Sequence, residues 1–124
     1  MSSLKMSDLI PDNIMFYPEA MEDFYCLDKG RQIMVIKVLQ KISLAPSKLG
    51  KPLENHPNRP LAGFRSTYVD NKSIRIIWTV KNSGIVEIAV IAGIAERNDL
   101  LAYTLVASRR QDIYKFIEEL LEKR

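Results

Sequence analysis

The sequence contains very little cysteine and histidine. Among its 124 residues there is one cysteine, Cys26, and one histidine, His56. A single cysteine forms no internal disulfide, and one cysteine with one histidine is too small a set for a Cys/His zinc site. We therefore expect a protein without a metal or a cofactor, in which Cys26 is a small buried side chain and His56 lies in a loop.

Other familiar features are missing as well. The sequence has no apolar run near the roughly 18 residues of a membrane-spanning helix, and its start lacks the apolar core of a secretory signal. It has no Gly-rich nucleotide-binding motif, and a ribonuclease site built on two histidines is impossible. Its 47% of hydrophobic side chains is enough to bury the core of one domain. We expect a cytoplasmic protein that binds no membrane.

Charge is distributed unevenly along the chain. Residues 1–30 carry two basic and six acidic side chains, a net charge of −4, whereas residues 31–81 carry ten basic and two acidic ones, a net charge of +8. A basic middle segment without low-complexity composition indicates a folded surface that faces a polyanion, although an uneven scatter of solvated charges gives the same counts. The lysines in this segment that we expect to bind RNA are Lys41, Lys48, Lys51 and Lys72.

Hydrophobic periodicity predicts an α+β fold of the order β-α-α-β-β-β-α, with helices packed on an antiparallel sheet. The apolar run 13–17 predicts the first strand, and Pro18 suits the first turn of the helix that follows. This helix is expected to close at the turn Asp28-Lys29-Gly30, and a second helix then ends before Pro46. Residues 47–63 carry three prolines and two glycines and are expected to form a loop.

The second half of the chain predicts three strands and a C-terminal helical stretch. The strands are 64–69, 74–80 and 85–94, separated by turn-rich tetrapeptides, and should form an antiparallel meander. The helical stretch opens at Asn98 and is either one helix or two, broken near Arg109. Its last apolar stripe either packs on the core, which we favour, or serves as a docking face. We divide the chain into an N-terminal extension (1–12), a main domain (13–108) and a C-terminal helical extension (109–124).

Three arginines lie near the ends of the predicted strands: Arg65, Arg75 and Arg97. In a meander they can gather toward one region of the sheet. Guanidinium groups bind phosphate through paired hydrogen bonds and stay charged, so such a cluster suits a scissile phosphate and its developing charge. Tyr103 follows within the first turns of the last helix, where it can stack on a base. The alternative is that these arginines are strand-end charges in contact with solvent.

The order of these residues resembles a known family. The segment PLAGFRSTYVDNKSIRIIWTV, followed by VEIAVIAGIAERNDLLAY, has a Leu-x-Gly lead into a strand, a hairpin, an arginine before two apolar residues and an aromatic, and then Arg-x5-Tyr. This combination is similar to the RelE/ParE superfamily of type II toxin–antitoxin toxins, and most of all to the RelE-type mRNA interferases. The resemblance covers roughly residues 13–108, and its specific part is residues 61–103.

The resemblance implies a ribosome-dependent endoribonuclease. Toxins of this kind enter the ribosomal A site and cut mRNA without a metal, using the 2′-hydroxyl of the RNA to attack the adjacent phosphate. The resemblance implies that Arg75 and Arg97 bind the phosphate and its developing charge, that Arg97 alternatively protonates the leaving oxygen, and that Tyr103 orients a base. Arg65 takes the position of a family lysine.

One position departs from the family pattern. Where the family has a lysine as general base, this sequence has Thr67, with the exact register left open by the hairpin length. Tyr103, Lys51 or Lys72 can substitute, or the RNA needs little base assistance once its hydroxyl is held in line. The resemblance also implies a cognate antitoxin as partner, beside ribosome and mRNA. Two other functions stay open: a ParE-type inhibitor of DNA gyrase, and a RelE-fold binding protein without catalytic activity.

Overall fold

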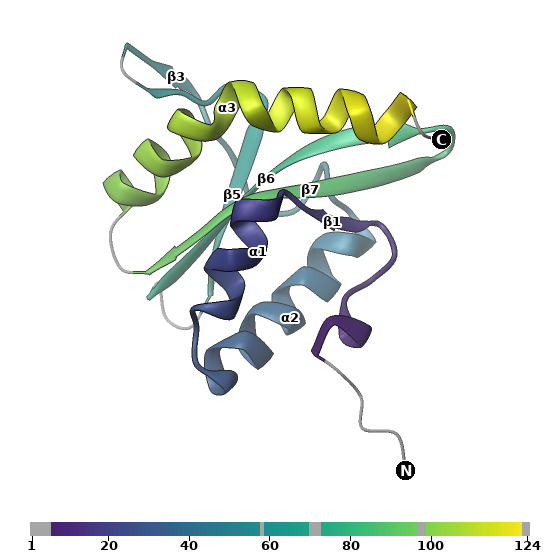
Figure 1. The fold of residues 1–124 in the computed structure, drawn as a ribbon, viewed down its shortest axis with the longest axis vertical. Helices are drawn as coiled ribbons and strands as arrows, with labels where there is room; N and C mark the ends of the chain where they lie inside the picture. Colours follow the sequence, from purple (N-terminus) through teal and green to yellow (C-terminus); the bar gives the residue numbers. More distant parts are fainter. Residues whose placement is uncertain (1–5, 58, 70–72, 97–98, 123–124) are drawn as a thin grey trace.

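The computed structural model describes residues 6–57, 59–69, 73–96 and 99–122. A five-stranded sheet runs through its centre in the order β1-β7-β6-β5-β2, and a second sheet of two short strands, β3 and β4, lies beside it (Figure 1). The strands are β1 (Ile14–Phe16), β2 (Lys51–Pro52), β3 (Asn55–His56), β4 (Arg59–Pro60), β5 (Phe64–Val69), β6 (Ile74–Ser83) and β7 (Val86–Glu96).

Helices pack on the central sheet, as predicted, and the structure shows that they cover it from two sides. They are the short 3-10 helix η1 (Met6–Leu9), α1 (Pro18–Tyr25), α2 (Lys29–Leu44) and α3 (Asp99–Glu122). Figure 1 shows α3 along one side of the sheet and α2 on the other. Within the described segments, no helix is long and apolar enough to cross a bilayer.

Local sequence signals explain where α1 and α2 begin. Pro18 stands at the first turn of α1, where its missing N–H costs no hydrogen bond. Asp28 is the N-cap of α2, and its side chain accepts a hydrogen bond of 2.8 Å from the backbone N–H of Arg31. The predicted turn at residues 28–30 is thus mostly the first turn of α2. Cys26 follows the end of α1 and is exposed, so the prediction of a buried cysteine was wrong.

The predicted meander is confirmed, since β5, β6 and β7 pair antiparallel in chain order. The first strand differs in direction from the predicted antiparallel sheet. β1 pairs in parallel with β7, with Ile14 opposite Ala89, so the sheet is mixed. A parallel neighbour requires a long connection, and α1, α2 and the strands from β2 to β6 lie between these two strands in the chain.

The segment 47–63 is not the continuous loop that its composition predicts. It contains three strands of two residues each, and His56 belongs to one of them, β3. The strand β2 pairs antiparallel with β5 and forms an edge of the central sheet, with Lys51 opposite Ser66. Strands this short show no periodicity in a sequence, because two residues do not complete an alternating pattern.

The C-terminal stretch, for which the sequence allowed one helix or two, forms the single helix α3. It continues through residues 108–110 without a break, so the proposed boundary at residue 109 falls inside it. Ile113 and Ile117 are buried in the core, and the Phe116 ring lies edge-on to that of Tyr17 at 5.8 Å between centroids. The expectation that this apolar stripe packs on the core is confirmed.

A buried ion pair fixes α3 to α1. Arg109 is only 8% exposed, and its Nη1 and Nη2 donate hydrogen bonds of 2.8 and 3.1 Å to the two carboxylate oxygens of Asp23. Nη1 also donates to the carbonyl of Ala92, and Nε lies 3.0 Å from Glu19 Oε2. Burial by itself lowers the pKa of Arg109, but the hydrogen bond and the charge of Asp23 outweigh it and raise the pKa. The guanidinium therefore stays charged, and α3 is held in one position along the sheet.

Candidate functional site

Alternation along β5 decides which side chains share a face of the sheet. Successive residues of a strand point to opposite faces, so Phe64, Ser66 and Tyr68 point one way. The ring of Phe64 lies 5.9 Å from that of Tyr114 in α3, and Ser66 Oγ accepts a hydrogen bond of 2.7 Å from Arg75 Nη1. We call this side of the sheet, which α3 covers, the pocket face.

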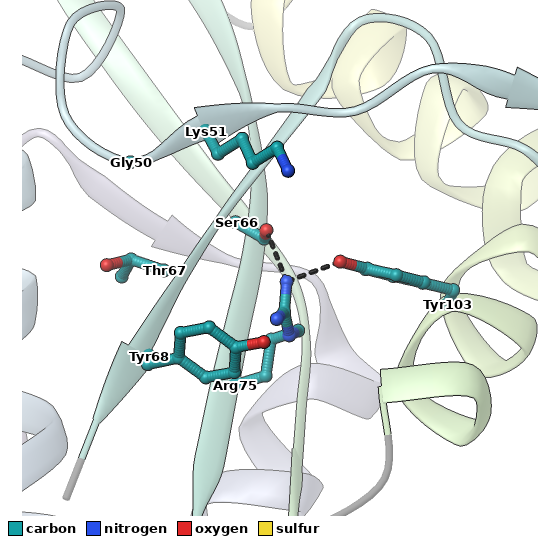
Figure 2. Close-up of a pocket in the computed structure, with 7 residues that line it drawn as sticks. All are labelled: Gly50, Lys51, Ser66, Thr67, Tyr68, Arg75 and Tyr103. Carbon is teal, nitrogen blue, oxygen red and sulfur yellow. Dashed lines mark hydrogen bonds between the residues drawn. The ribbon is translucent and has the colours of Figure 1, made fainter. Parts of the chain in front are cut away.

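Arg75 lies at the centre of the pocket face. It is 7% exposed, and Tyr68 is its direct partner across β5 and β6. Its guanidinium carbon lies 3.9 Å from the centroid of the Tyr68 ring and 5.0 Å from that of Tyr103, so two aromatic rings contact the cation. Nη1 donates hydrogen bonds to the hydroxyls of Ser66 and Tyr103 (Figure 2). These contacts fix the direction of the planar guanidinium.

Tyr103 reaches the pocket from the first turns of α3. Its neighbour Ala102 and the next-turn residue Val106 are buried against the sheet at 1% and 0% exposure. Residues three and four apart share one side of a helix, so Ala102 and Val106 hold that side of α3 against the sheet. Tyr103 lies at the edge of this packed side. The Tyr103 hydroxyl points toward Arg75 in Figure 2.

Lys51 enters the same pocket from the edge strand β2. Its direct partner across the strands is Ser66, and cross-strand partners share a face. Figure 2 shows its ammonium group extending from β2 toward the space between Ser66 and Tyr103. The cavity has a volume of about 310 Å³, and the residues that line it are Gly50, Lys51, Ser66, Thr67, Tyr68, Arg75 and Tyr103. Two cationic side chains and four hydroxyl-bearing residues thus surround a space large enough for a phosphate group.

A second hollow continues from this pocket. It measures about 270 Å³, and its lining residues are Lys51, Pro52, Leu53, Glu54 and Tyr103. Lys51 and Tyr103 line both spaces, so the two hollows adjoin along these side chains. The site thus offers two neighbouring hollows, with Lys51 and Tyr103 between them.

The structure brings together some of the residues expected from the sequence. Arg75, Tyr103 and Lys51 line the pocket. Lys41 and Lys48 are exposed and do not line it. Arg97 and Lys72 lie outside the described residues.

Arg65 and Thr67 are on the other side of β5. The Arg65 side chain donates to the backbone carbonyls of Leu49 and Gly50, and it does not line the pocket. Thr67 is at the rim, and Figure 2 shows its side chain pointing away from Arg75. Neither side chain is therefore directed at Arg75.

Sequence reasoning missed Ser66 and Tyr68 as residues of the site. Both are the partners of Arg75 on β5, one through a hydrogen bond and the other through its ring. The register of the β5–β6 hairpin would identify them, because it determines whether the odd-numbered or the even-numbered side chains of β5 lie beside Arg75. Once Tyr68 is opposite Arg75, the even-numbered residues of β5 are on the pocket face.

Comparison with known proteins gives matches in structure only. No family sequence model matches the chain, and no curated protein does either. A chain of the toxin–antitoxin complex RelBE2 from Mycobacterium tuberculosis is 22% identical, with a TM-score of 0.56, over 71% of this chain and 100% of that one. An arginine-substituted mutant of the E. coli toxin RelE in the free state is 12% identical, with a TM-score of 0.60, over 77% and 94% of the two chains.

A third solved structure agrees with these two. It is a YoeB/ParE toxin from Agrobacterium tumefaciens, 15% identical, with a TM-score of 0.55, and the match covers 68% of this chain and 98% of that one. Almost the full length of each of the three matched chains thus aligns with a part of this chain. The chain therefore has the RelE-like fold.

Proposed function

We propose that this chain is the toxin of a type II toxin–antitoxin system and that it cleaves mRNA on the ribosome. The observation that carries the proposal is the position of Arg75, held by two hydroxyls and two aromatic rings at a cavity that Lys51 also lines. The RelE-like fold supports it, because two of the similar structures are toxins by name and the third is a toxin–antitoxin complex. The proposed reaction needs no metal and no cofactor.

In the proposed reaction the 2′-hydroxyl oxygen of one nucleotide attacks the adjacent phosphorus. The bond from phosphorus to the 5′ oxygen breaks, which leaves a 2′,3′-cyclic phosphate and a 5′-hydroxyl. Negative charge grows on the phosphate oxygens during the attack, and a preoriented guanidinium stabilises such charge strongly. Arg75 has this role, Lys51 adds a second positive charge, and Tyr103 stacks on or orients a neighbouring base.

The reaction also moves two protons, because the attacking 2′-hydroxyl loses one and the leaving 5′ oxygen gains one. The Thr67 side chain points away from Arg75 and has no basic group, so β5 supplies no base at that position. We propose that water accepts the proton of the 2′-hydroxyl and that alignment of the RNA replaces much of the help that a base gives. Arg97 keeps its predicted role, which is to bind the phosphate or to protonate the leaving 5′ oxygen.

A gyrase-inhibiting toxin of the ParE type is the alternative. The structure from A. tumefaciens is named for both YoeB and ParE, so the shared fold alone does not separate the two functions. The pocket around Arg75 favours the nuclease, since a protein that acts by binding gyrase has no need of a phosphate site. A RelE-fold binding protein without activity is a third function, and the same experiment tests it.

Primer extension on mRNA from an in vitro translation reaction distinguishes these functions. We expect the wild-type protein to cut mRNA in translating ribosomes, to leave free RNA intact, and to produce ends with a 2′,3′-cyclic or 3′-phosphate. Arg75→Gln should abolish the cuts, whereas Lys37→Gln, an exposed change on α2, should not. Intact mRNA together with blocked gyrase supercoiling would favour the ParE type. Intact mRNA without gyrase inhibition would favour the binding protein.

We further propose that the chain acts in the cytoplasm and pairs with an antitoxin. One of the similar structures is a toxin–antitoxin complex. If this chain has such a partner, its expression alone should arrest growth, and co-expression of the protein encoded beside it should restore growth. Growth arrest that the neighbouring protein does not relieve would argue against this pairing.

A further inference from the structure

Arg65 touches the segment that leads into β2. Its Nε donates a hydrogen bond of 2.8 Å to the carbonyl of Leu49, and its Nη2 donates one of 3.2 Å to the carbonyl of Gly50. These are the last two carbonyls before Lys51. The guanidinium thus binds the backbone next to the pocket from the opposite face of β5.

Two further contacts hold the same segment. Gly50 lies so close to β5 that a Cβ built on it would be 2.5 Å from the carbonyl oxygen of Ser66 and 2.6 Å from Cη2 of Trp78. The indole N–H of Trp78 donates a 3.0 Å hydrogen bond to the carbonyl of Pro46. Residues 46–50 are therefore fixed at both ends against the sheet.

This anchoring sets where the Lys51 side chain goes. Lys51 is directly opposite Ser66, and such partners have Cβ atoms about 5 Å apart on one face of a sheet. The β5 side chains that accompany it on the pocket face, Ser66 and Tyr68, carry no charge. β5 therefore places no positive charge beside Arg75, and Lys51 supplies one from the edge strand β2.

We propose that Arg65 is a positioning residue: by binding the carbonyls of Leu49 and Gly50 it fixes β2, so that Lys51 holds its ammonium beside Arg75 as the second cation for an RNA phosphodiester. This inference rests on the proposed nuclease function and names the ligand of that same site. Arg65 acts through Lys51 and does not touch the RNA. Its effect on phosphate binding must then vanish when Lys51 is absent.

A double-mutant cycle tests this dependence. The probe is a DNA dinucleotide, which has the phosphodiester but no 2′-hydroxyl and is not cut, and its dissociation constant is measured by NMR titration. We expect Lys51→Met to weaken binding about tenfold, the effect of roughly one charged hydrogen bond. Arg65→Met should weaken it by a similar factor. The double variant should bind like Lys51→Met alone, within about twofold.

Other outcomes overturn the inference. If the affinity losses of the two single variants multiply in the double variant, Arg65 acts independently of Lys51. If Arg65→Met binds the dinucleotide as the wild type does, Arg65 does not position Lys51. If the wild type does not bind the dinucleotide, the pocket is not a phosphate site and the inference is refuted. Lys37→Met is the charge-matched control and should bind normally. Should Arg65→Met fail to fold, Arg65→Gln keeps an N–H donor for one carbonyl and serves in its place.

The fluorescence of Trp78 reports on the anchoring without any ligand. It is the only tryptophan in the sequence and is fully buried beside Gly50. We expect acrylamide to quench Trp78 more strongly in Arg65→Met and equally in Lys51→Met and wild type. Equal quenching in all three proteins would overturn the anchoring by Arg65. These measurements stay decisive if the wild type cuts no mRNA, a result that would refute the proposed function instead.

Discussion

Replacing Gly50 with alanine measures how tightly β2 is pressed against the sheet. Gly50 has a φ of +74°, and the left-handed region costs other residues about 1–2 kcal/mol. The new Cβ would also lie 2.5 Å from the Ser66 carbonyl oxygen and 2.6 Å from Trp78 Cη2. A paired strand and a buried indole yield little, and overpacking costs roughly 1–3 kcal/mol. The free energy of unfolding should fall by about 2–5 kcal/mol, less the ~0.4–1 kcal/mol gained from a stiffer unfolded chain.

Gly84→Ala is the matched control for this experiment. Gly84 has a φ of +67°, and a Cβ added there meets no heavy atom within 4 Å, so only the backbone cost of about 1–2 kcal/mol applies. Urea denaturation followed by circular dichroism gives both losses. We expect Gly50→Ala to lose at least about 1 kcal/mol more than Gly84→Ala. Equal losses would refute the close contact between residue 50 and β5.

Three further predictions concern the site and the core. Arg75→Lys should lower mRNA cleavage about 100-fold in the translation assay, because an ammonium lacks the planar fork that binds phosphate, and full activity would contradict the assignment. Ser66→Ala should lower cleavage roughly fivefold, since Arg75 loses one hydrogen-bond acceptor, whereas Thr67→Ala should stay within about twofold of wild type; the reverse order would indicate that Thr67 faces the RNA. Asp23→Ala leaves Arg109 buried without its main carboxylate and should cost about 3–5 kcal/mol in urea denaturation, and a loss under about 1 kcal/mol would contradict the buried ion pair.

Elements with local signals could be predicted from the sequence. Pro18 and Asp28 mark the starts of α1 and α2 through the chemistry of a helix N-terminus, which involves only neighbouring residues. The meander follows from apolar runs separated by short polar turns. The parallel pairing of β1 with β7 depends on residues about 75 positions apart, Ile14 and Ala89, and no local pattern encodes it.

The site was harder to predict because strand register decides it. A shift of one residue exchanges every side chain between the two faces of a strand. In β5, Ser66 on the pocket face and Val69 on the other are both buried, so the sequence shows no clear alternation of polar and apolar residues. The position of Arg65 near a strand end and the family resemblance predict a site residue, but neither decides its face, and it is Ser66 that points toward Arg75.

The strand β2 was not predictable for another reason. It has two residues, one of them Pro52, and proline is rare within sheets. Its existence depends on the close approach of Gly50 to Ser66, a tertiary contact. Lys51 could be named from charge alone, but its place beside Arg75 could not.

The composition of β2 also bears on how the molecule behaves in concentrated solution. An unpaired strand at the rim of a sheet offers its free N–H and C=O groups to a second molecule, and such pairing leads to aggregation. β2 occupies that rim of the central sheet with only Lys51 and Pro52, so it presents a charge and a residue that has no N–H to donate. β2 thereby covers the edge of β5 at Arg65 and Ser66. Lys51, in addition to lining the pocket, places at this rim a charge that disfavours extension of the sheet by a neighbouring molecule.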